Sequence, residues 1–165
     1  MTQRVDLATV MDRLAIDAVI TGYAVAVDDG EWADYRALFT PDGRADYRGA
    51  GGVEGPAHEV AEWLARTMRL FPVRQHLVVN RRIGFQDLDG YPGDRSEVLA
   101  DYVNPMRLEN ATAGPGDAEV RATAPNFVSG GRYAFSLSRT DSGWRIRTVT
   151  VHEKWRGPAG PSTAG

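Results

Sequence analysis

The apolar residues of this chain change their spacing near Pro72, and this change limits the possible folds more than any other feature. Before Pro72 they recur about every 3.6 residues, as on one face of a helix. After it they alternate, as in strands with two unlike faces. Separators that contain glycine divide the second half, as is typical of turns between antiparallel strands. Helices followed by an antiparallel meander predict an α+β domain, with helices covering one face of a bent sheet.

The expected elements can be placed from this pattern. Helices are predicted at about 7–29, where Gly30 ends the first of them, at 31–39 and at 57–70, with a short strand at 45–49. The strands of the second half are predicted at 73–85, 96–108, 118–127, 131–139 and 144–155.

The length and composition favour one domain. A chain of 165 residues with 42% hydrophobic content is long enough for one buried core and too short for two ordinary domains. We place this domain at 1–156 and expect 157–165, which is rich in Gly and Pro, to form a flexible tail.

Several function classes are disfavoured. The net charge of -3 and the scattered arginines offer no basic patch for nucleic acid. There is no cysteine, no signal-like N-terminus and no run of 18 apolar residues, so we expect a soluble, cytoplasmic protein that does not enter a membrane. No metal is expected, because His58 and His152 do not form a ligand spacing with His76. No nucleotide cofactor is expected, because no GxGxxG or P-loop motif occurs.

The strand VRQHLVVN carries a candidate base. Alternation puts His76, Val78 and Asn80 on one face, and Leu77 and Val79 on the other. We expect the first face to line a pocket under the helices. The apolar outer face then needs another cover, which predicts a homodimer through the sheet. A lone inward histidine is commonly a core residue bonded to a backbone carbonyl, so a catalytic role requires a partner.

A partner is available at the end of the first helix, where Asp28 and Asp29 stand against an unfavourable helix dipole. At 100° per residue, Asp28 borders the buried stripe that contains Tyr23, whereas Asp29 faces water. Asp29 can cap the second helix. Asp28 has no comparable structural role, and we predict that it faces His76.

The order of the elements and their motifs resemble a known family. Tyr23 is followed, after four residues, by Asp28. Gly30 and the pair Glu31-Trp32 come next, and then a short helix that ends in Leu-Phe. A DYRG strand, a Trp-bearing helix, a QH-x-x-x-N strand and a closing DSGWRI strand follow. This pattern, over residues 7–155, is similar to the SnoaL-like branch of the nuclear transport factor 2-like superfamily. The resemblance implies a cone-shaped barrel of bent, antiparallel or mixed sheet, with three to four helices on its concave face. That fold serves polyketide cyclases, isomerases, dehydratases, a dehydrochlorinase, an epoxide hydrolase and binding modules.

The resemblance also implies site residues. A bile-acid dehydratase and a dehydrochlorinase of this fold use an Asp at the end of the first helix and a His on the first long strand, and the matching residues are Asp28 and His76. Tyr23 and Tyr47 match tyrosines of the dehydratase pocket.

Further pocket residues are less constrained. Asp101 and Arg139 are rough counterparts of an Asp and an Arg in the dehydratase. Asp101 could protonate a leaving hydroxyl, or it could form a buried ion pair with Arg139 or Arg82. Tyr133 and Phe135 share the alternation of Arg139 and could line the pocket as well. Asn80 could orient a ligand or only satisfy the backbone.

The function implied is that of a cofactor-independent acid/base enzyme, a dehydratase, cyclase or isomerase acting on a small apolar polyketide-, steroid- or terpenoid-like compound. His76 would remove a proton, Asp28 would orient His76, and Tyr23 and Tyr47 would stabilise the oxyanion. One alternative is epoxide opening. The other is a non-catalytic binding or dimerisation module, which predicts Asp28 more than about 4 Å from His76 and no cavity of roughly 300 Å³ or more.

Overall fold

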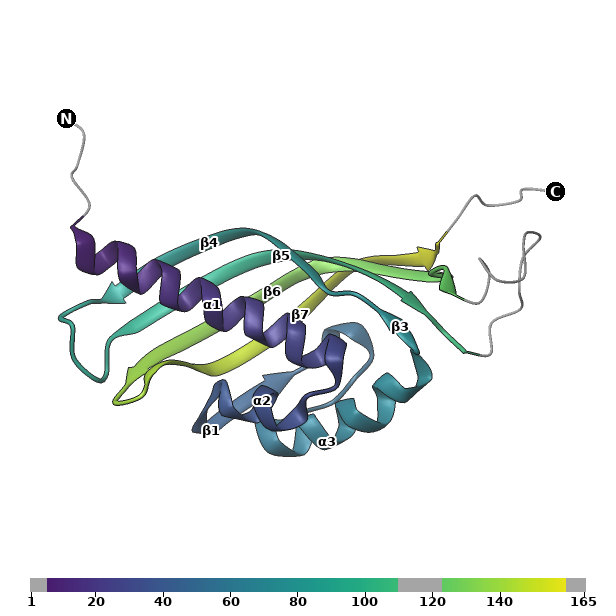
Figure 1. The fold of residues 1–165 in the computed structure, drawn as a ribbon, viewed down its shortest axis with the longest axis horizontal. Coiled ribbons are helices and arrows are strands. Elements are labelled where there is room, and N and C mark those ends of the chain that lie inside the picture. The colour runs from purple at the N-terminus through teal and green to yellow at the C-terminus, as the bar shows by residue number, and fades with distance from the viewer. Residues whose placement is uncertain (1–5, 110–122, 160–165) are drawn as a thin grey trace.

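The computed structural model describes residues 6–109 and 123–159. Helices occupy most of the first half and strands the second (Figure 1). The elements are α1 (Leu7–Asp29), α2 (Trp32–Ala37), β1 (Phe39–Asp46), η1 (Arg48–Ala50), β2 (Glu54–Pro56), α3 (Ala57–Thr67), η2 (Met68–Leu70), β3 (Val73–Arg74), β4 (Leu77–Asp87), β5 (Arg95–Arg107), β6 (Phe127–Thr140) and β7 (Gly143–Pro158).

The ends of α1 are fixed by local interactions. The Asp6 carboxylate accepts a hydrogen bond of 2.7 Å from the backbone N–H of Thr9, a standard N-cap. Gly30 takes the left-handed conformation, with φ 74°, and its N–H returns to the carbonyl of Ala26. Because this C-cap closes the helix at Asp29, Asp28 is held in a regular last turn.

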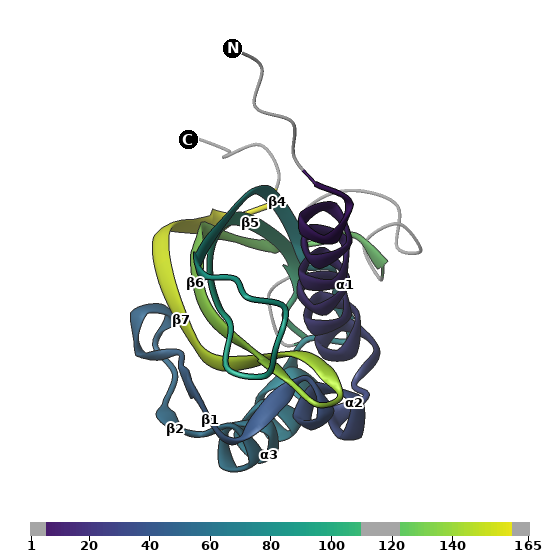
Figure 2. The same ribbon diagram turned by 90° about the vertical axis from the view of Figure 1, so that its left-hand side faces the viewer.

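The strands within the described residues form one mixed sheet in the order β2-β1-β7-β6-β5-β3, and β4 also pairs with β5. All pairings are antiparallel except that of β1 with β7. Figure 2 shows β4 to β7 as an arc, with α1 across its open side and α2 and α3 at one end. The predicted α+β class, a strongly bent sheet with helices on its concave face, is confirmed.

An aromatic cluster fills the core between α1 and the sheet. The Tyr23 ring lies edge-on to Tyr133 and Phe135, with centroids 5.5 and 5.3 Å away, and is tilted against Tyr35 at 5.6 Å. All four rings are nearly inaccessible to solvent. Such edge-to-face packing fixes ring positions as well as burying apolar area, so α1 is held at a defined height above the sheet.

Several predicted boundaries differ from the structure. The predicted strand at 73–85 is broken, because Gln75 and His76 separate β3 from β4. The residues 40–43, expected to end the second helix, lie inside β1. They form an irregularity in its parallel pairing with β7, between the pairs Phe39–Ile146 and Arg44–Thr148. The strand predicted at 45–49 therefore begins earlier, at 39.

The glycine-containing separator expected before the strand at 131–139, Ser129-Gly130-Gly131, is not a turn, because β6 continues through it with a bulge. A Cβ at Gly130 would overlap the Trp155 ring, and one at Gly131 would overlap the backbone of His152. These glycines permit close approach of β7 rather than a turn. Of the strand predicted at 118–127, residues 118–122 lie outside the described residues, and 123–126 are not a strand.

The end of the chain is partly described. Strand β7 extends through Gly157 and Pro158, the first two residues of the expected tail, and residues 160–165 lie outside the described part. In residues 6–109 and 123–159, no helix combines the length and apolarity needed to cross a bilayer.

Candidate active site

A cavity of about 200 Å³ opens between the end of α1, the α3–η2 segment and the concave face of β5, β6 and β7. Its wall is mainly apolar, with side chains such as Val27, Leu64, Met68 and Phe71. His76 is the histidine that lines it. An apolar wall with a few polar groups is the usual form of a small-molecule site.

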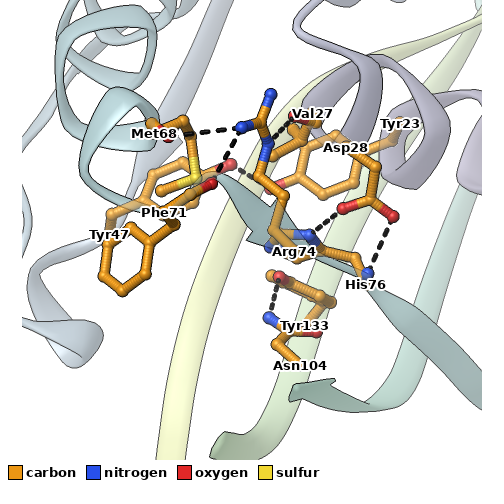
Figure 3. A network of polar contacts seen from close by, with 10 residues as sticks. All are labelled: Tyr23, Val27, Asp28, Tyr47, Met68, Phe71, Arg74, His76, Asn104 and Tyr133. Carbon is orange, nitrogen blue, oxygen red and sulfur yellow. Dashed lines mark hydrogen bonds and ion pairs between the residues drawn. The ribbon is translucent and has the colours of Figure 1, made fainter. Parts of the chain in front are cut away.

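The side chains of Asp28 and His76 are in contact (Figure 3), and His76 lines the cavity. Asp28 Oδ1 lies 2.5 Å from His76 Nδ1, and Asp28 Oδ2 accepts the backbone N–H of His76 at 2.8 Å. The His76 side chain is 8% exposed and that of Asp28 is 20% exposed. The predicted pair is therefore formed, and a single carboxylate holds both the ring and the backbone of the histidine.

This geometry determines the tautomer of the ring. An ionised carboxylate can only accept hydrogen bonds, so Nδ1 of His76 carries a hydrogen and donates it to Asp28. Nε2 then has the lone pair in the neutral ring. Within the described residues no side chain or carbonyl bonds to Nε2, so it is available to a ligand in the cavity.

Arg74 fastens the elements that carry this pair. Its Nε donates to the carbonyl of Val27 at 3.0 Å, and its Nη1 donates to those of Met68 and Phe71 at 3.2 and 3.1 Å (Figure 3). One guanidinium thus joins the last turn of α1, the end of α3–η2 and the strand two residues before His76. The sequence indicated no role for Arg74, since backbone carbonyls leave no signal in side-chain patterns.

Tyr23 and Tyr47 approach each other at the cavity. Their hydroxyls are joined by a short hydrogen bond, and the Tyr35 hydroxyl lies 3.5 Å from that of Tyr47. One of the two protons lies in the bond between them, so the pair has at most one proton to donate to a ligand. Burial raises the pKa of Tyr23 and of Tyr47 well above the usual value of 10.0, so both remain neutral donors at physiological pH.

Asn80 and Asp101 do not line the cavity, so the structure does not support the ligand contacts that were one of the two alternatives for each. Two residues of β4, Asn80 and Arg81, stand opposite one residue of β5, and Asn80 has a φ of 51°. This bulge turns Asn80 outward, where its amide donates to Asp101 at 3.2 Å. Asp101 alternates with Tyr102 on β5, so it lies on the outer face.

There Asp101 pairs with Arg132 at 2.8 Å, and not with Arg139 or Arg82. Hydrogen bonds from Arg132 and Asn80 lower the pKa of Asp101 to about 2. A carboxyl that stays ionised and faces away from the cavity cannot protonate a leaving group there.

Arg139 also lies away from the cavity. It forms ion pairs with Asp12 at 2.7 Å and Asp94 at 3.0 Å, and stacks over Trp144 at 4.8 Å. Asp12 further accepts the Trp144 indole N–H. These contacts tie the start of α1 to the β4–β5 and β6–β7 hairpins, a structural role that long sequence separation concealed.

The aromatic residues predicted on β6 divide between core and cavity. Tyr133 lines the cavity, and its hydroxyl lies 3.5 Å from the Asn104 amide nitrogen. Phe135 is fully buried in the core and does not line it. The structure adds Tyr102, Asn104 and Glu153 to the polar groups of the cavity. Because side chains alternate between the two faces of a strand, the positions of these residues on β5 and β7 would indicate that they line the cavity once it is known which face is buried.

Two features of the structure bear on the choice between an enzyme and a non-catalytic binding module. The distance of 2.5 Å between Asp28 and His76 agrees with the catalytic interpretation. The cavity of about 200 Å³ is smaller than the roughly 300 Å³ expected of an enzyme and agrees with a binding module. Within the described residues, no group of three or more His, Asp or Glu side chains lies close enough to hold a metal ion.

Comparison with known sequences gives a family and relatives without a known activity. A model of the SnoaL-like domain matches residues 8–150. Uncharacterised proteins of Mycobacterium tuberculosis and Mycobacterium bovis are 29% identical over 140 residues, which are 85% of this chain and 84% of theirs.

Solved structures share the fold. A hexachlorocyclohexane dehydrochlorinase, LinA type 3 from Novosphingobium barchaimii, has a TM-score of 0.73 at 16% identity, covering 98% of this chain and 99% of that one. A scytalone dehydratase candidate from Novosphingobium aromaticivorans has a TM-score of 0.70 at 14% identity, covering 96% and 97%. At such identities the likeness establishes a common fold and no more.

Proposed function

The chain belongs to the SnoaL-like domain family, and from the geometry of its cavity we propose that it is a cofactor-independent acid/base enzyme, a dehydratase, cyclase or isomerase. One observation carries the proposal. Asp28 Oδ1 lies 2.5 Å from His76 Nδ1, which leaves Nε2 as a base beside an apolar cavity. The dehydrochlorinase and the dehydratase candidate of the same fold support a reaction of the elimination or isomerisation kind.

The reaction begins with removal of a proton from carbon. Nε2 of His76 takes the proton, and the carboxylate of Asp28 stabilises the imidazolium that results. The substrate is a small, mostly apolar carbonyl or hydroxyl compound, because the wall offers apolar contacts and few charges. The resemblance to the family implies a compound of polyketide, steroid or terpenoid type. A 200 Å³ cavity restricts how much of such a compound is enclosed.

The tyrosine pair would stabilise the negative charge that develops. Its one free proton is donated to the carbonyl or enolate oxygen, and the low polarity around it strengthens that hydrogen bond. Since burial keeps both hydroxyls protonated, the pair acts as a donor and not as a second base.

Dehydration then requires an acid for the leaving hydroxyl. Asp101 is on the outer face, so the proton held by His76 after the first step is the nearest source. In that scheme the C–H and C–O bonds break, a C=C bond forms, and His76 returns its proton to the departing hydroxide as water. The two bonds would lie on the same face of the substrate, a syn elimination.

The alternatives differ in their support. Epoxide opening in this fold uses an Asp–Arg–Asp set around a water. Asp12, Arg139 and Asp94 form a set of these residue types, but their carboxylates are bound by Arg139, Trp144 and backbone N–H groups and do not line the cavity. A non-catalytic binding module is favoured by one observation, the small volume of the cavity.

Deuterium exchange tests the proposal before a substrate is known. Small β-hydroxy ketones are incubated in D₂O with the enzyme, and mass spectrometry follows deuterium at the acidic C–H and loss of water. The wild type should catalyse exchange, His76→Ala should not, and Asp28→Asn should be slower by about 10²-fold or more. Asp29→Asn, the exposed neighbour, is the matched control. Exchange that survives intact in folded His76→Ala would exclude the proposed base.

A further inference from the structure

Two buried polar atoms at the cavity have no hydrogen-bond partner, the amide oxygen Oδ1 of Asn104 and the hydroxyl of Tyr102. Both side chains line the cavity from alternate positions of β5. The Ser129 hydroxyl lies near that of Tyr102 and donates to Glu153 at 3.0 Å, but it can still accept a hydrogen bond from Tyr102. Asn104 Oδ1 is therefore the stronger case of the two. Buried atoms without a partner are few in natural proteins, and each requires an explanation.

The Asn104 side chain cannot turn away from this position at little cost. It is 5% exposed, and its amide nitrogen donates to the Tyr133 hydroxyl at 3.5 Å (Figure 3). Tyr133 is itself fixed by the Tyr102 ring, whose centroid lies 4.5 Å away. The backbone of Asn104 is paired with Ser129 in the middle of the sheet. The Asn104 side chain, with its unpartnered oxygen, is therefore held in place in the wall of the cavity.

The chemistry of this oxygen selects its partner. An amide oxygen accepts hydrogen bonds and cannot donate them, so only a donor such as a hydroxyl or N–H satisfies it. The Tyr102 hydroxyl can take either role. The Asp28–His76 pair does not contact the Asn104 oxygen or the Tyr102 hydroxyl. In the proposed reaction the lone pair of His76 Nε2 accepts the proton from carbon, so it does not accept the donor of the ligand.

We propose that Asn104 Oδ1 receives a hydroxyl or N–H group of the ligand, and that this contact decides which small apolar compounds the cavity selects. This inference rests on the proposed function in one respect, that the cavity holds the substrate. The substrate then carries a hydrogen-bond donor in addition to the C–H that His76 attacks. Such a site rejects an analogue without the donor, because the analogue leaves the oxygen buried and unpaired.

Three benzene derivatives of similar size test the proposal by binding. Phenol carries a donor, fluorobenzene carries neither donor nor strong acceptor, and benzonitrile carries only an acceptor. Their dissociation constants are measured by NMR titration of the wild type. We expect phenol to bind about tenfold more tightly than either of the others.

Asn104→Leu keeps the shape of the side chain and removes the oxygen. In this variant the advantage of phenol should disappear, while fluorobenzene should bind as well as before or better. The thermal stability should be equal or higher, because no buried oxygen remains unpaired. If Asn104→Leu does not fold, Asn104→Ala is titrated instead. Asn80→Gly, outside the cavity at a φ that glycine tolerates, is the control and should keep the preference.

Each contrary outcome overturns the proposal. These are equal affinities of phenol and fluorobenzene, tightest binding of benzonitrile, a phenol preference that persists in the Asn104 variants, and no binding of phenol up to its solubility. The test does not depend on turnover. A phenol preference that depends on Asn104, found together with deuterium exchange that ignores His76, would retain the inference and reject the proposed function.

Discussion

The two carboxylate oxygens of Asp28 bind two different parts of His76, the ring nitrogen Nδ1 at 2.5 Å and the backbone N–H at 2.8 Å. The second contact places the backbone of His76, which lies between β3 and β4 and outside either strand. The first sets the ring. Asp28 therefore replaces the strand pairing that would otherwise hold this residue, and it does so with the group that also orients the base.

This geometry predicts the tautomer of His76. Long-range ¹H–¹⁵N NMR of the neutral ring should show hydrogen on Nδ1 and none on Nε2, because Asp28 only accepts. Asp28→Asn, whose amide can also donate, should produce a mixture of tautomers. Asp29→Asn should leave the spectrum of His76 unchanged, since Asp29 is exposed. A wild-type ring with hydrogen on Nε2 would contradict the assignment of the base.

The tyrosine hydroxyls predict unequal effects of two similar substitutions. In Tyr23→Phe, the Tyr47 hydroxyl still has a hydrogen-bond partner, the Tyr35 hydroxyl at 3.5 Å. In Tyr47→Phe, Tyr23 and Tyr35 both lose their hydroxyl partner. Tyr47→Phe should therefore lower the free energy of unfolding by about 1–3 kcal/mol, and more than Tyr23→Phe does. Urea denaturation measures both. Equal losses, or a greater loss in Tyr23→Phe, would contradict this hydrogen-bond order.

Local rules could predict the position of Asp28, whereas Tyr47 and the pairing of Asp28 with His76 as a dyad were implied by the resemblance to the family. The angle of Asp28 on α1 follows from 100° per residue, and Gly30 fixes where that helix ends. The face on which Asn80 lies was predicted wrongly because it depends on the register between β4 and β5. The bulge at Asn80 and Arg81 turns Asn80 to the other face, and a strand pattern does not indicate an inserted residue.

Other features of the site depend on contacts between distant segments. Asp29 does not cap α2, whose N-cap is Glu31 without a side-chain bond, because the chain turns sharply at Gly30. Arg139 finds Asp12, 127 positions away, and alternation along β6 gives no sign of it. The sequence places Asn104 on the strand that carries a second pocket histidine in the scytalone dehydratase pattern, but it does not show that the Asn104 oxygen lacks a partner.

Arg74 is predicted to be a positioning residue. Arg74→Met should lower kcat more than it raises KM, because the three carbonyls it holds set where Asp28 lies relative to His76. Arg74→Lys should not restore activity, since one ammonium cannot reproduce the guanidinium fork. The readouts are kcat, KM and the Nδ1 proton signal of His76. Arg69→Met, at an exposed arginine of η2, is the control. An unchanged His76 signal in Arg74→Met would leave Arg74 a purely structural role.

The cluster of Asp12, Arg139 and Asp94 predicts a pH-dependent variant. Burial opposes charge on both carboxylates, but hydrogen bonds from Arg139, from Trp144 and from backbone N–H groups outweigh it and hold the pKa of Asp12 and of Asp94 below 3.8. Because these pKa values are lowered by folding, the stabilisation is present above pH 3.8 and is lost as the pH falls through the folded-state values.

Arg139→Met should therefore lower the free energy of unfolding at pH 7 by about 3 kcal/mol, since it leaves two buried carboxylates without a cation. The deficit should shrink below about pH 4, where both carboxyls become protonated. Arg44→Met, at the exposed pair with Glu54, should cost at most about 1 kcal/mol at either pH. Urea titrations at the two pH values measure the difference. A deficit in Arg139→Met that is constant with pH would show that packing, not charge, is lost.

The outer face of the sheet predicts the oligomeric state. Leu77, Val79 and Leu99 are 44%, 45% and 36% exposed on this face, and a second copy packed against it would cover them. We expect light scattering to give the mass of two chains, and the double variant Val79→Glu with Leu99→Glu to give the mass of one. The competing surface is the exposed side of α1, where Leu14 is 60% exposed. Leu14→Glu should leave the dimer intact, because the proposed interface does not include α1. A monomeric wild type would contradict the prediction, and dissociation by Leu14→Glu alone would move the interface from the sheet to α1.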